Sequence, residues 1–146
     1  MFMGKHSHTV DAKGRMIVPS VFREELGESF VITRGLDACL TIYPKENWQK
    51  KAESLQSLST TRKDVRALIR FLIGGSNEVE YDKQGRILIP AHLREYAQIK
   101  RDAIVIGIGD RIEVWDKEKY AAHENEQIES IGEIAESLEL PIDFSI

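Results

Sequence analysis

Residues 9–24 read TVDAKGRMIVPSVFRE, and residues 80–95 read EYDKQGRILIPAHLRE. At a constant offset of 71 residues, the two stretches share an aspartate, a glycine, an arginine, a proline, a second arginine and a glutamate. Their intervening apolar positions also match in character. An internal repeat fixes the architecture of a chain, so it is sought before any other pattern. Agreement at this many positions predicts that the chain contains the same small unit twice.

The repeat extends beyond these two stretches. After a one-residue slip, residues 40–48 (LTIYPKENW) align with residues 112–120 (IEVWDKEKY). We therefore predict a first unit at residues 5–47, linking helices at 48–75, a second unit at 76–119 and an acidic helical tail at 120–146.

Each unit is predicted to hold four strands and one short helix. The first strand enters a polar turn, Asp-x-x-Gly-Arg, in which glycine supplies a positive φ and aspartate bonds its own backbone two residues on. The second strand ends at a proline, which cannot donate to a strand ladder and which suits the start of a helix. The expected strands are 6–10, 15–18, 30–34 and 39–43, then 77–81, 86–89, 103–107 and 111–115, with helices at 20–26 and 91–97.

The segments outside the units are predicted to be helical. One helix is expected at 44–58, and a second begins near Thr61, whose spacing to Asp64 resembles a capping box, and ends at Gly74-Gly75. Apolar residues recur at helical spacing from 128 to 138, with Pro141 as the stop. This pattern indicates an acidic amphipathic helix that docks on its own chain or on a neighbour.

The net charge of −4 comes from one segment. Residues 120–146 hold seven acidic residues and no lysine or arginine, whereas residues 48–75 hold six basic and two acidic residues. The rest of the chain without the tail is therefore net positive, and the overall acidity does not exclude an anionic partner.

The composition indicates a cytoplasmic protein. The single cysteine, Cys39, cannot form an internal disulfide and lies between apolar neighbours, which favours a buried structural thiol in a reducing compartment. The apolar runs are far too short for a membrane span, and residues 1–6 lack the apolar core of a signal peptide. We expect no membrane partner.

No catalytic constellation is visible. The sequence has no phosphate-binding Gly-x-x-x-x-Gly-Lys loop, no zinc-hydrolase helix, and no cysteine or serine beside an identifiable base. His6 and His8 alternate on a predicted strand, but a metal site needs more ligands than these two. We expect no enzyme activity, no small-molecule substrate, no cofactor and no metal.

The two turns, Asp11–Arg15 and Asp82–Arg86, each followed by apolar residues, a proline and a short helix, resemble those of the MraZ family. These bacterial regulators are built from two SpoVT/AbrB-type units in one chain, and the resemblance runs from about Lys5 to Tyr120. It implies a β-rich α+β fold, in which two swapped hairpins interlace into a pseudo-symmetric β-barrel with linking and C-terminal helices.

The resemblance also implies a function. Members of the family are sequence-specific transcription regulators that bind double-stranded DNA at repeated promoter sites upstream of the bacterial division and cell-wall gene cluster, which includes their own gene. They form ring-like homo-oligomers, often octamers, and associate with the nucleoid. A ring that repeats the reading head would strengthen weak single contacts by avidity.

The turns are the expected DNA contact. Arg15 and Arg86 can present guanidinium groups to guanine edges or phosphates, and we expect Arg15 to be the principal reader because the first unit has basic flanks. The remaining expected contacts position the protein on phosphates or shape the turns; they are Lys5, Asp11, Lys13 and Gly14, and Asp82, Lys83 and Gly85. In the alternative interpretation, each aspartate simply holds its arginine in an ion pair that fixes the turn.

Other interpretations remain open. The basic run at 62–70 is either a second DNA-facing surface or the solvated face of a helix. The same fold also serves as an antitoxin-like protein-binding module, and the acidic helix suits a scaffold that recruits other proteins. An acidic tail of this charge would also shield a DNA-binding surface.

Overall fold

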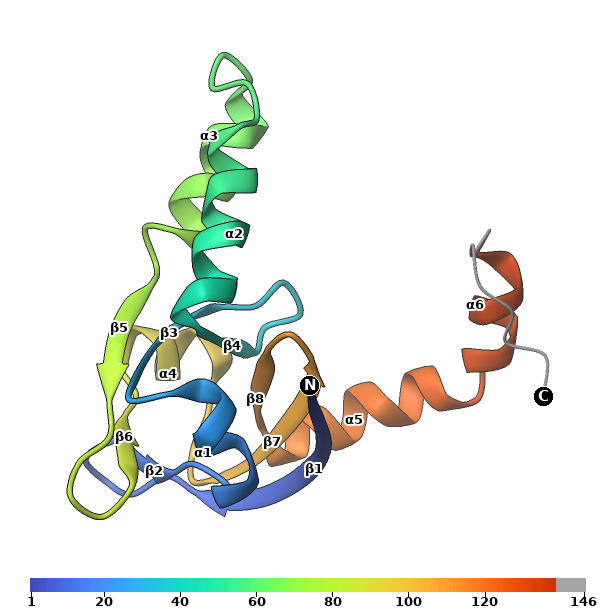
Figure 1. Cartoon of the computed structure of the whole chain (residues 1–146). Coiled ribbons are helices and arrows are strands. Elements are labelled where there is room, and N and C mark those ends of the chain that lie inside the picture. The colour runs from blue at the N-terminus through green and yellow to red at the C-terminus, as the bar shows by residue number, and fades with distance from the viewer. Residues whose placement is uncertain (139–146) are drawn as a thin grey trace.

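The computed structural model describes residues 1–138 as a mixed α+β fold, which confirms the predicted class (Figure 1). Eight strands and six helices follow one another along this part of the chain. The strands are β1 Phe2–Thr9, β2 Arg15–Ile17, β3 Ser29–Arg34, β4 Leu40–Pro44, β5 Asn77–Glu80, β6 Arg86–Leu88, β7 Asp102–Gly109 and β8 Ile112–Asp116. The helices are α1 Ser20–Leu26, α2 Lys45–Gln56, α3 Lys63–Leu72, α4 Ala91–Ala97, α5 Lys117–Ile128 and α6 Ile131–Ser137.

The two units exchange their first strands. The large sheet has the order β1-β7-β8-β4-β3-β5, and all its pairs are antiparallel. Strand β1 of the first unit pairs with β7 of the second, and β5 of the second unit pairs with β3 of the first. Strands β2 and β6 form a separate two-stranded sheet. The strands of the two units are therefore interlaced, while the pairing within residues 1–138 gives two sheets and no closed barrel.

One core serves both units. Phe30, Ile32 and Ile42 of the first unit lie in the same buried cluster as Leu93 and Val105 of the second. Every second residue of β3 and β4 enters this core, as a period of two requires, and the residues between them, such as Val31 and Thr41, are buried on the opposite face of the sheet. Because each unit places strands in the other's sheet and side chains in a shared core, neither unit holds a complete fold by itself.

Several predicted boundaries shift because pairing, and not local sequence, ends a strand. Strand β1 begins at Phe2 instead of residue 6, since its partner β7 extends to Gly109 and the two stay in register from Phe2↔Gly109 to Thr9↔Asp102.

The predicted burial of Cys39 is confirmed, and burial raises the pKa of its thiol to about 12.

The linking helices α2 and α3 rise together from the body (Figure 1). The predicted capping box at Thr61 is wrong, because α3 begins at Lys63 and no side chain caps it. The Thr61 hydroxyl instead bonds the Ser59 hydroxyl, and the Asp64 carboxylate accepts hydrogen bonds from Arg62. Because Thr61 and Asp64 each bond a neighbouring side chain, they do not form the reciprocal hydrogen bonds of a capping box.

Within the described residues the C-terminal segment is helical, as its apolar spacing predicted, but it is not one continuous helix. It consists of α5 and α6, separated at Glu129-Ser130, and α6 stands clear of the body (Figure 1). Serine and glycine are weak helix formers; Ser130 lies in the break, and Gly132 follows it in the first turn of α6. Helix α5 begins at Lys117, where the Asp116 carboxylate accepts a hydrogen bond from the Lys119 amide. The predicted stop at Pro141 lies outside the described residues.

Candidate nucleic-acid interface

Both polar turns adopt the same backbone conformation. In the first, the Gly14 amide donates to the Asp11 carbonyl at 2.9 Å, and the Asp11 amide donates to the Arg15 carbonyl at 2.9 Å. In the second, the corresponding distances for Gly85 and Asp82 are 3.1 and 2.8 Å. Gly14 and Gly85 have φ values of +88° and +75°, which side chains with a Cβ rarely adopt. The repeated Asp-x-x-Gly-Arg sequence therefore encodes one turn geometry twice.

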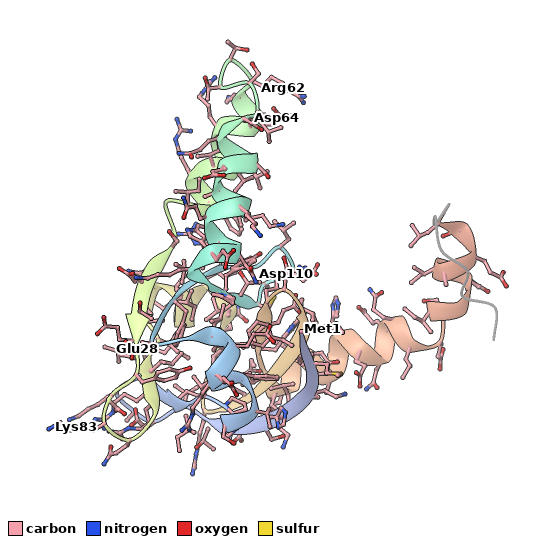
Figure 2. The ribbon with its side chains drawn as sticks, in the orientation of Figure 1. Met1, Glu28, Arg62, Asp64, Lys83 and Asp110 are labelled. Carbon is pink, nitrogen blue, oxygen red and sulfur yellow. The ribbon has the colours of Figure 1, made fainter. Side chains whose placement is uncertain are left out.

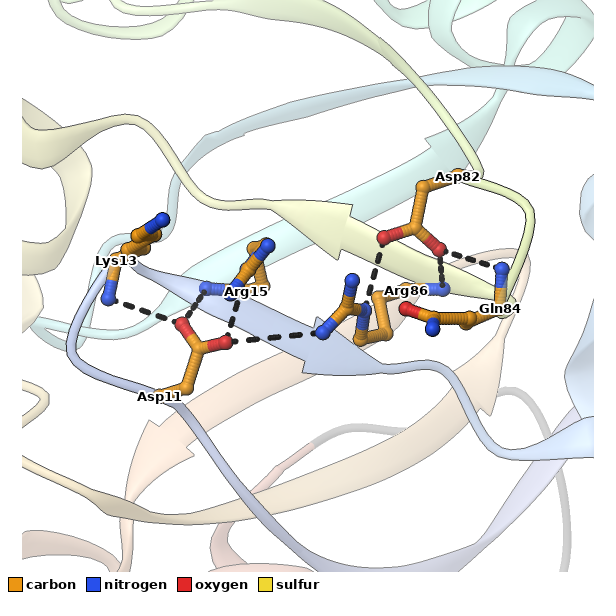
Figure 3. A network of polar contacts seen from close by, with 6 residues as sticks. All are labelled: Asp11, Lys13, Arg15, Asp82, Gln84 and Arg86. Atoms are coloured by element: carbon orange, nitrogen blue, oxygen red, sulfur yellow. Dashed lines mark hydrogen bonds and ion pairs between the residues drawn. The ribbon is translucent and has the colours of Figure 1, made fainter.

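Each aspartate ties its turn to the following arginine (Figure 3). One oxygen of Asp11 accepts hydrogen bonds from the Lys13 and Arg15 amides at 3.0 and 2.9 Å, and the other accepts from Arg15 Nε at 2.9 Å. Asp82 does the same with the Gln84 and Arg86 amides and with Arg86 Nε, at 2.8 to 2.9 Å. Hydrogen bonds from the Arg15 and Arg86 backbone amides are the main reason that the pKa of each aspartate lies below its usual value.

The turns lie at the two ends of the β2–β6 ribbon. Strand β2 runs antiparallel to β6, with Arg15 opposite Leu88 and Ile17 opposite Arg86. The central residues of the two strands are buried in the core, so their neighbours in sequence face outward. The outer face of the ribbon therefore presents Arg15 and Arg86 together with the exposed Ile17 and Leu88. We call the two turns and this outer face the turn face.

The aspartate pairs leave part of each guanidinium group free. Asp11 accepts from Arg15 through Nε, and the two terminal nitrogens of Arg15 make no hydrogen bond to any residue in 1–138. Arg86 is held more fully, because its Nη1 also lies 3.9 Å from a carboxylate oxygen of Asp11. An arginine fixed along one edge can still offer its other edge to a ligand, so the structural and the DNA-contact interpretations are compatible.

Sequence reasoning missed two residues of this face. A Cβ placed on Gly14 would lie 2.6 Å from Cζ of Arg94, and one placed on Gly85 would lie 2.8 Å from Cζ of Arg23. Arg23 Nε donates to the Val18 carbonyl and Arg94 Nε to the Ile89 carbonyl, both at 3.0 Å. Each turn thus rests on an arginine of the other unit. Arg23 and Arg94 occupy equivalent positions in the two copies of the repeat, and this equivalence was the sequence signal that would have identified them.

The predicted lysines fall into two groups. Lys13 and Lys83 are exposed on their turns, and Figure 2 shows Lys83 at the opposite end of the molecule from Arg62 and Asp64. Lys5 lies elsewhere, on β1 beside α5, where its Nζ is 3.1 Å from a Glu124 carboxylate oxygen and 5.1 Å from the centre of the Tyr120 ring. The structure therefore brings eight of the nine predicted site residues together and separates Lys5 from them.

No metal or membrane feature accompanies the turn face. Within residues 1–138, no group of three or more histidine, cysteine, aspartate or glutamate side chains is arranged to hold a metal ion. The His6 ring packs edge-on against Phe22, with 5.3 Å between ring centres. None of the described helices is long and apolar enough to span a membrane.

Comparison with known proteins gives a consistent answer. The profile of a family described as "MraZ protein, putative antitoxin-like" matches twice, at residues 1–71 and 72–140. A protein of Heliobacterium modesticaldum is 49% identical over 146 residues, with both chains covered completely. Proteins of a Thermoanaerobacter species and of Acetivibrio thermocellus are 52% and 55% identical, covering 95% and 91% of this chain and 97% and 95% of their own. All three are named transcriptional regulator MraZ. With two profile matches and full-length relatives at this identity, the chain belongs to the MraZ family.

Proposed function

We propose that this protein is a sequence-specific DNA-binding transcription regulator. The observation that supports this most strongly is the turn face, on which a two-stranded ribbon presents two half-free arginines between two exposed lysine-bearing turns. The names of the MraZ relatives point to the same class of protein.

The ribbon suits the major groove of DNA, where base edges carry a distinct donor and acceptor pattern and where a two-stranded ribbon fits. Arg15 and Arg86 would present their free edges to guanine or to phosphate. Lys13 and Lys83 would bind phosphates, which position the protein without reading the sequence. Arg23 and Arg94 would support the turns from below and add positive charge.

Within this proposal, Arg15 is the principal reader. Arg86 is engaged by two aspartates, whereas Arg15 is engaged by one, so Arg15 reorients toward DNA at a smaller cost in internal contacts. The first unit would therefore contribute more to recognition than the second.

The further parts of the proposal concern the assembly. We propose the division into two units at 5–47 and 76–119 with linking helices and a tail, an interlaced swapped-hairpin barrel, and a ring-like homo-oligomer, such as an octamer, that binds repeated promoter sites. The target would be the region upstream of a bacterial division and cell-wall gene cluster. A protein with this role would lie on the nucleoid in the cytoplasm and would need neither a cofactor nor catalytic residues.

The experiment is a fluorescence-anisotropy titration against labelled DNA from the gene's own upstream region, with a scrambled duplex beside it, at two salt concentrations. We expect a preference for the native duplex that persists at the higher salt, because phosphate attraction weakens with salt while base readout remains. Arg15→Ala should reduce the affinity for the native duplex by about 10-fold or more, since one good arginine–guanine contact contributes about 1–3 kcal/mol.

The matched control is Arg70→Ala, an exposed arginine on α3. It should leave the preference intact if the 62–70 run is a solvated helix face. Equal and strongly salt-sensitive binding to both duplexes would contradict the proposal and would favour the protein-binding alternatives, an antitoxin-like module or a scaffold.

A further inference from the structure

The C-terminal arm, residues 117–138, is attached to the body only through its beginning. Tyr120 and His123 pack against Trp115, with ring centres 5.5 and 4.8 Å apart, and Glu124 pairs with Lys5. Beyond Glu124 the arm leads away from the body, and α6 stands clear of it (Figure 1). The second half of the arm therefore lacks a packing surface within the described part of its own chain.

This second half carries the residues of an interface. Ile128, Ile131 and Leu138 are 60, 56 and 52% exposed. Between residues 120 and 138 the arm has five glutamates and no lysine or arginine. Exposed apolar residues that are grouped and rimmed by charge indicate a binding surface. A matching partner must offer apolar contacts surrounded by positive charge.

The same chain carries such a surface at the base of α2. A pocket of about 190 Å³ lies between α2, the β3–β4 loop, the end of α3 and β8. Its apolar wall includes Tyr43, Trp48 and Leu72, and Lys51 and Arg111 line it as well. The loop adds Leu36, an exposed apolar side chain at the rim. We call this the helix-base pocket.

Charge complementarity links the two surfaces. Residues 48–75, which include most of α2 and all of α3, hold six basic and two acidic residues, opposite in sign to the arm. The two carboxylates at the pocket are Asp37 and Glu113, and that of Glu113 already accepts a hydrogen bond from Trp115 Nε1 at 2.9 Å. Three cationic side chains, Arg34, Lys51 and Arg111, line the pocket against these two carboxylates. Arg111 is already paired with Asp110 at 2.9 Å, so the attraction for glutamates of the arm would centre on Lys51.

We propose that the C-terminal arm of one copy docks in the helix-base pocket of a second copy, with its isoleucines against Trp48 and Leu72 and its glutamates beside Lys51. The arm cannot fill the pocket of its own chain in this conformation, because α6 lies well apart from α2 and α3 in Figure 1. Two different surfaces meet in this contact, so it is head-to-tail, and a head-to-tail contact closes into a ring when the rotation permits. The inference deepens the proposed function, since it rests on the proposed homo-oligomer and names the surfaces that build it.

The first test measures the mass of the full chain without DNA, by sedimentation velocity over a range of concentrations. Ile131→Glu changes the arm and Lys51→Glu changes the pocket, and each should raise the dissociation constant of self-association by about 10-fold or more. The controls are Val21→Glu, a similarly exposed apolar position on α1, and Lys63→Glu at the far tip of the helix pair. Both controls should assemble as the unmodified protein does.

The second test mixes the two defective variants. Ile131→Glu retains an intact pocket and Lys51→Glu retains an intact arm, so an equimolar mixture should form a 1:1 complex. Larger oligomers should not form, because the arm and the pocket left over in this complex are the two altered ones. This complex also shows that both variants are folded. The proposal is overturned if the unmodified chain stays monomeric, if Ile131→Glu keeps the full oligomer, or if the mixture stays monomeric. None of these outcomes involves DNA, so failure here leaves the proposed DNA binding to its own test.

Discussion

Asp11 and Asp82 each combine a structural and an electrostatic role in one carboxylate. Each accepts two backbone hydrogen bonds that close its turn, and each also pairs with the arginine that we expect to contact DNA. Hydrogen bonding to the charged form favours that form, which explains why the pKa of both groups is lowered. The charge of these residues therefore contributes to folding stability as well as to arginine placement.

This coupling predicts a pH dependence. A carboxylate whose pKa is lower in the folded than in the unfolded chain stabilises the fold fully above the unfolded value, near 3.8, and loses this contribution as the pH falls through the folded value. Asp11→Asn/Asp82→Asn should therefore lower the free energy of unfolding at pH 7, and the deficit should shrink below about pH 4. Urea unfolding of both proteins from pH 7 to pH 3 measures it. A deficit that stays constant over this range would contradict the assignment.

Gly14 allows a direct test of the contact between the units. Gly14→Ala should lower the free energy of unfolding by more than the about 1–2 kcal/mol that a left-handed backbone costs, because the new Cβ displaces the Arg94 guanidinium group. Gly109 is the matched control, since it has a similar φ of +89° and a Cβ added to it would meet no atom within 4 Å. In an Arg94→Ala background the cost of Gly14→Ala should fall to that of Gly109→Ala. Equal costs in both backgrounds would show that Arg94 does not support the turn.

At the scale of helices, strands and turns, the local sequence pattern correctly predicted those features that depend on interactions between residues close in the chain. The helices after Pro19 and Pro90 begin and end as expected, because proline fixes the start and the apolar spacing fixes the face. The turns formed as expected because glycine and aspartate determine them locally. These same features determine the backbone of each turn, whereas the closeness of the two turns comes from the pairing of β2 with β6.

The features that the sequence did not predict depend on partners distant in the chain. The length of β1 is set by its pairing with β7 of the other unit, and the sequence of β1 alone does not indicate this length. Lys5 was predicted from its charge to join the turns, but its position on β1 places it against α5, where Glu124 holds it. Arg23 and Arg94 were visible as repeated residues, yet only the strand exchange places each beneath the turn of the opposite unit.

In the whole molecule, opposite charges are gathered at separate places. The turn face lies at one end and the tip of α2 and α3 at the other, while the acidic arm projects to the side (Figures 1 and 2). The arm neutralises one basic residue directly, through Glu124 and Lys5. Its remaining glutamates lower the potential around the molecule, which acts on any approaching polyanion.

Removal of the arm should therefore change DNA binding through charge. Deleting residues 121–146 removes seven acidic and no basic residues and turns a chain of net charge −4 into a net positive one. On a short duplex of unrelated sequence, where repeated heads give no avidity, binding should become tighter and its salt dependence steeper. A full-length variant, Glu126→Gln/Glu129→Gln/Glu133→Gln/Glu136→Gln, should shift both quantities in the same direction while keeping the apolar positions of the arm. Anisotropy titrations at several salt concentrations measure the affinity and the slope of its logarithm against that of the salt. If a folded truncated chain and the glutamine variant both keep the original affinity and slope, the arm does not shield the DNA surface, and its acidity serves the contact between copies alone.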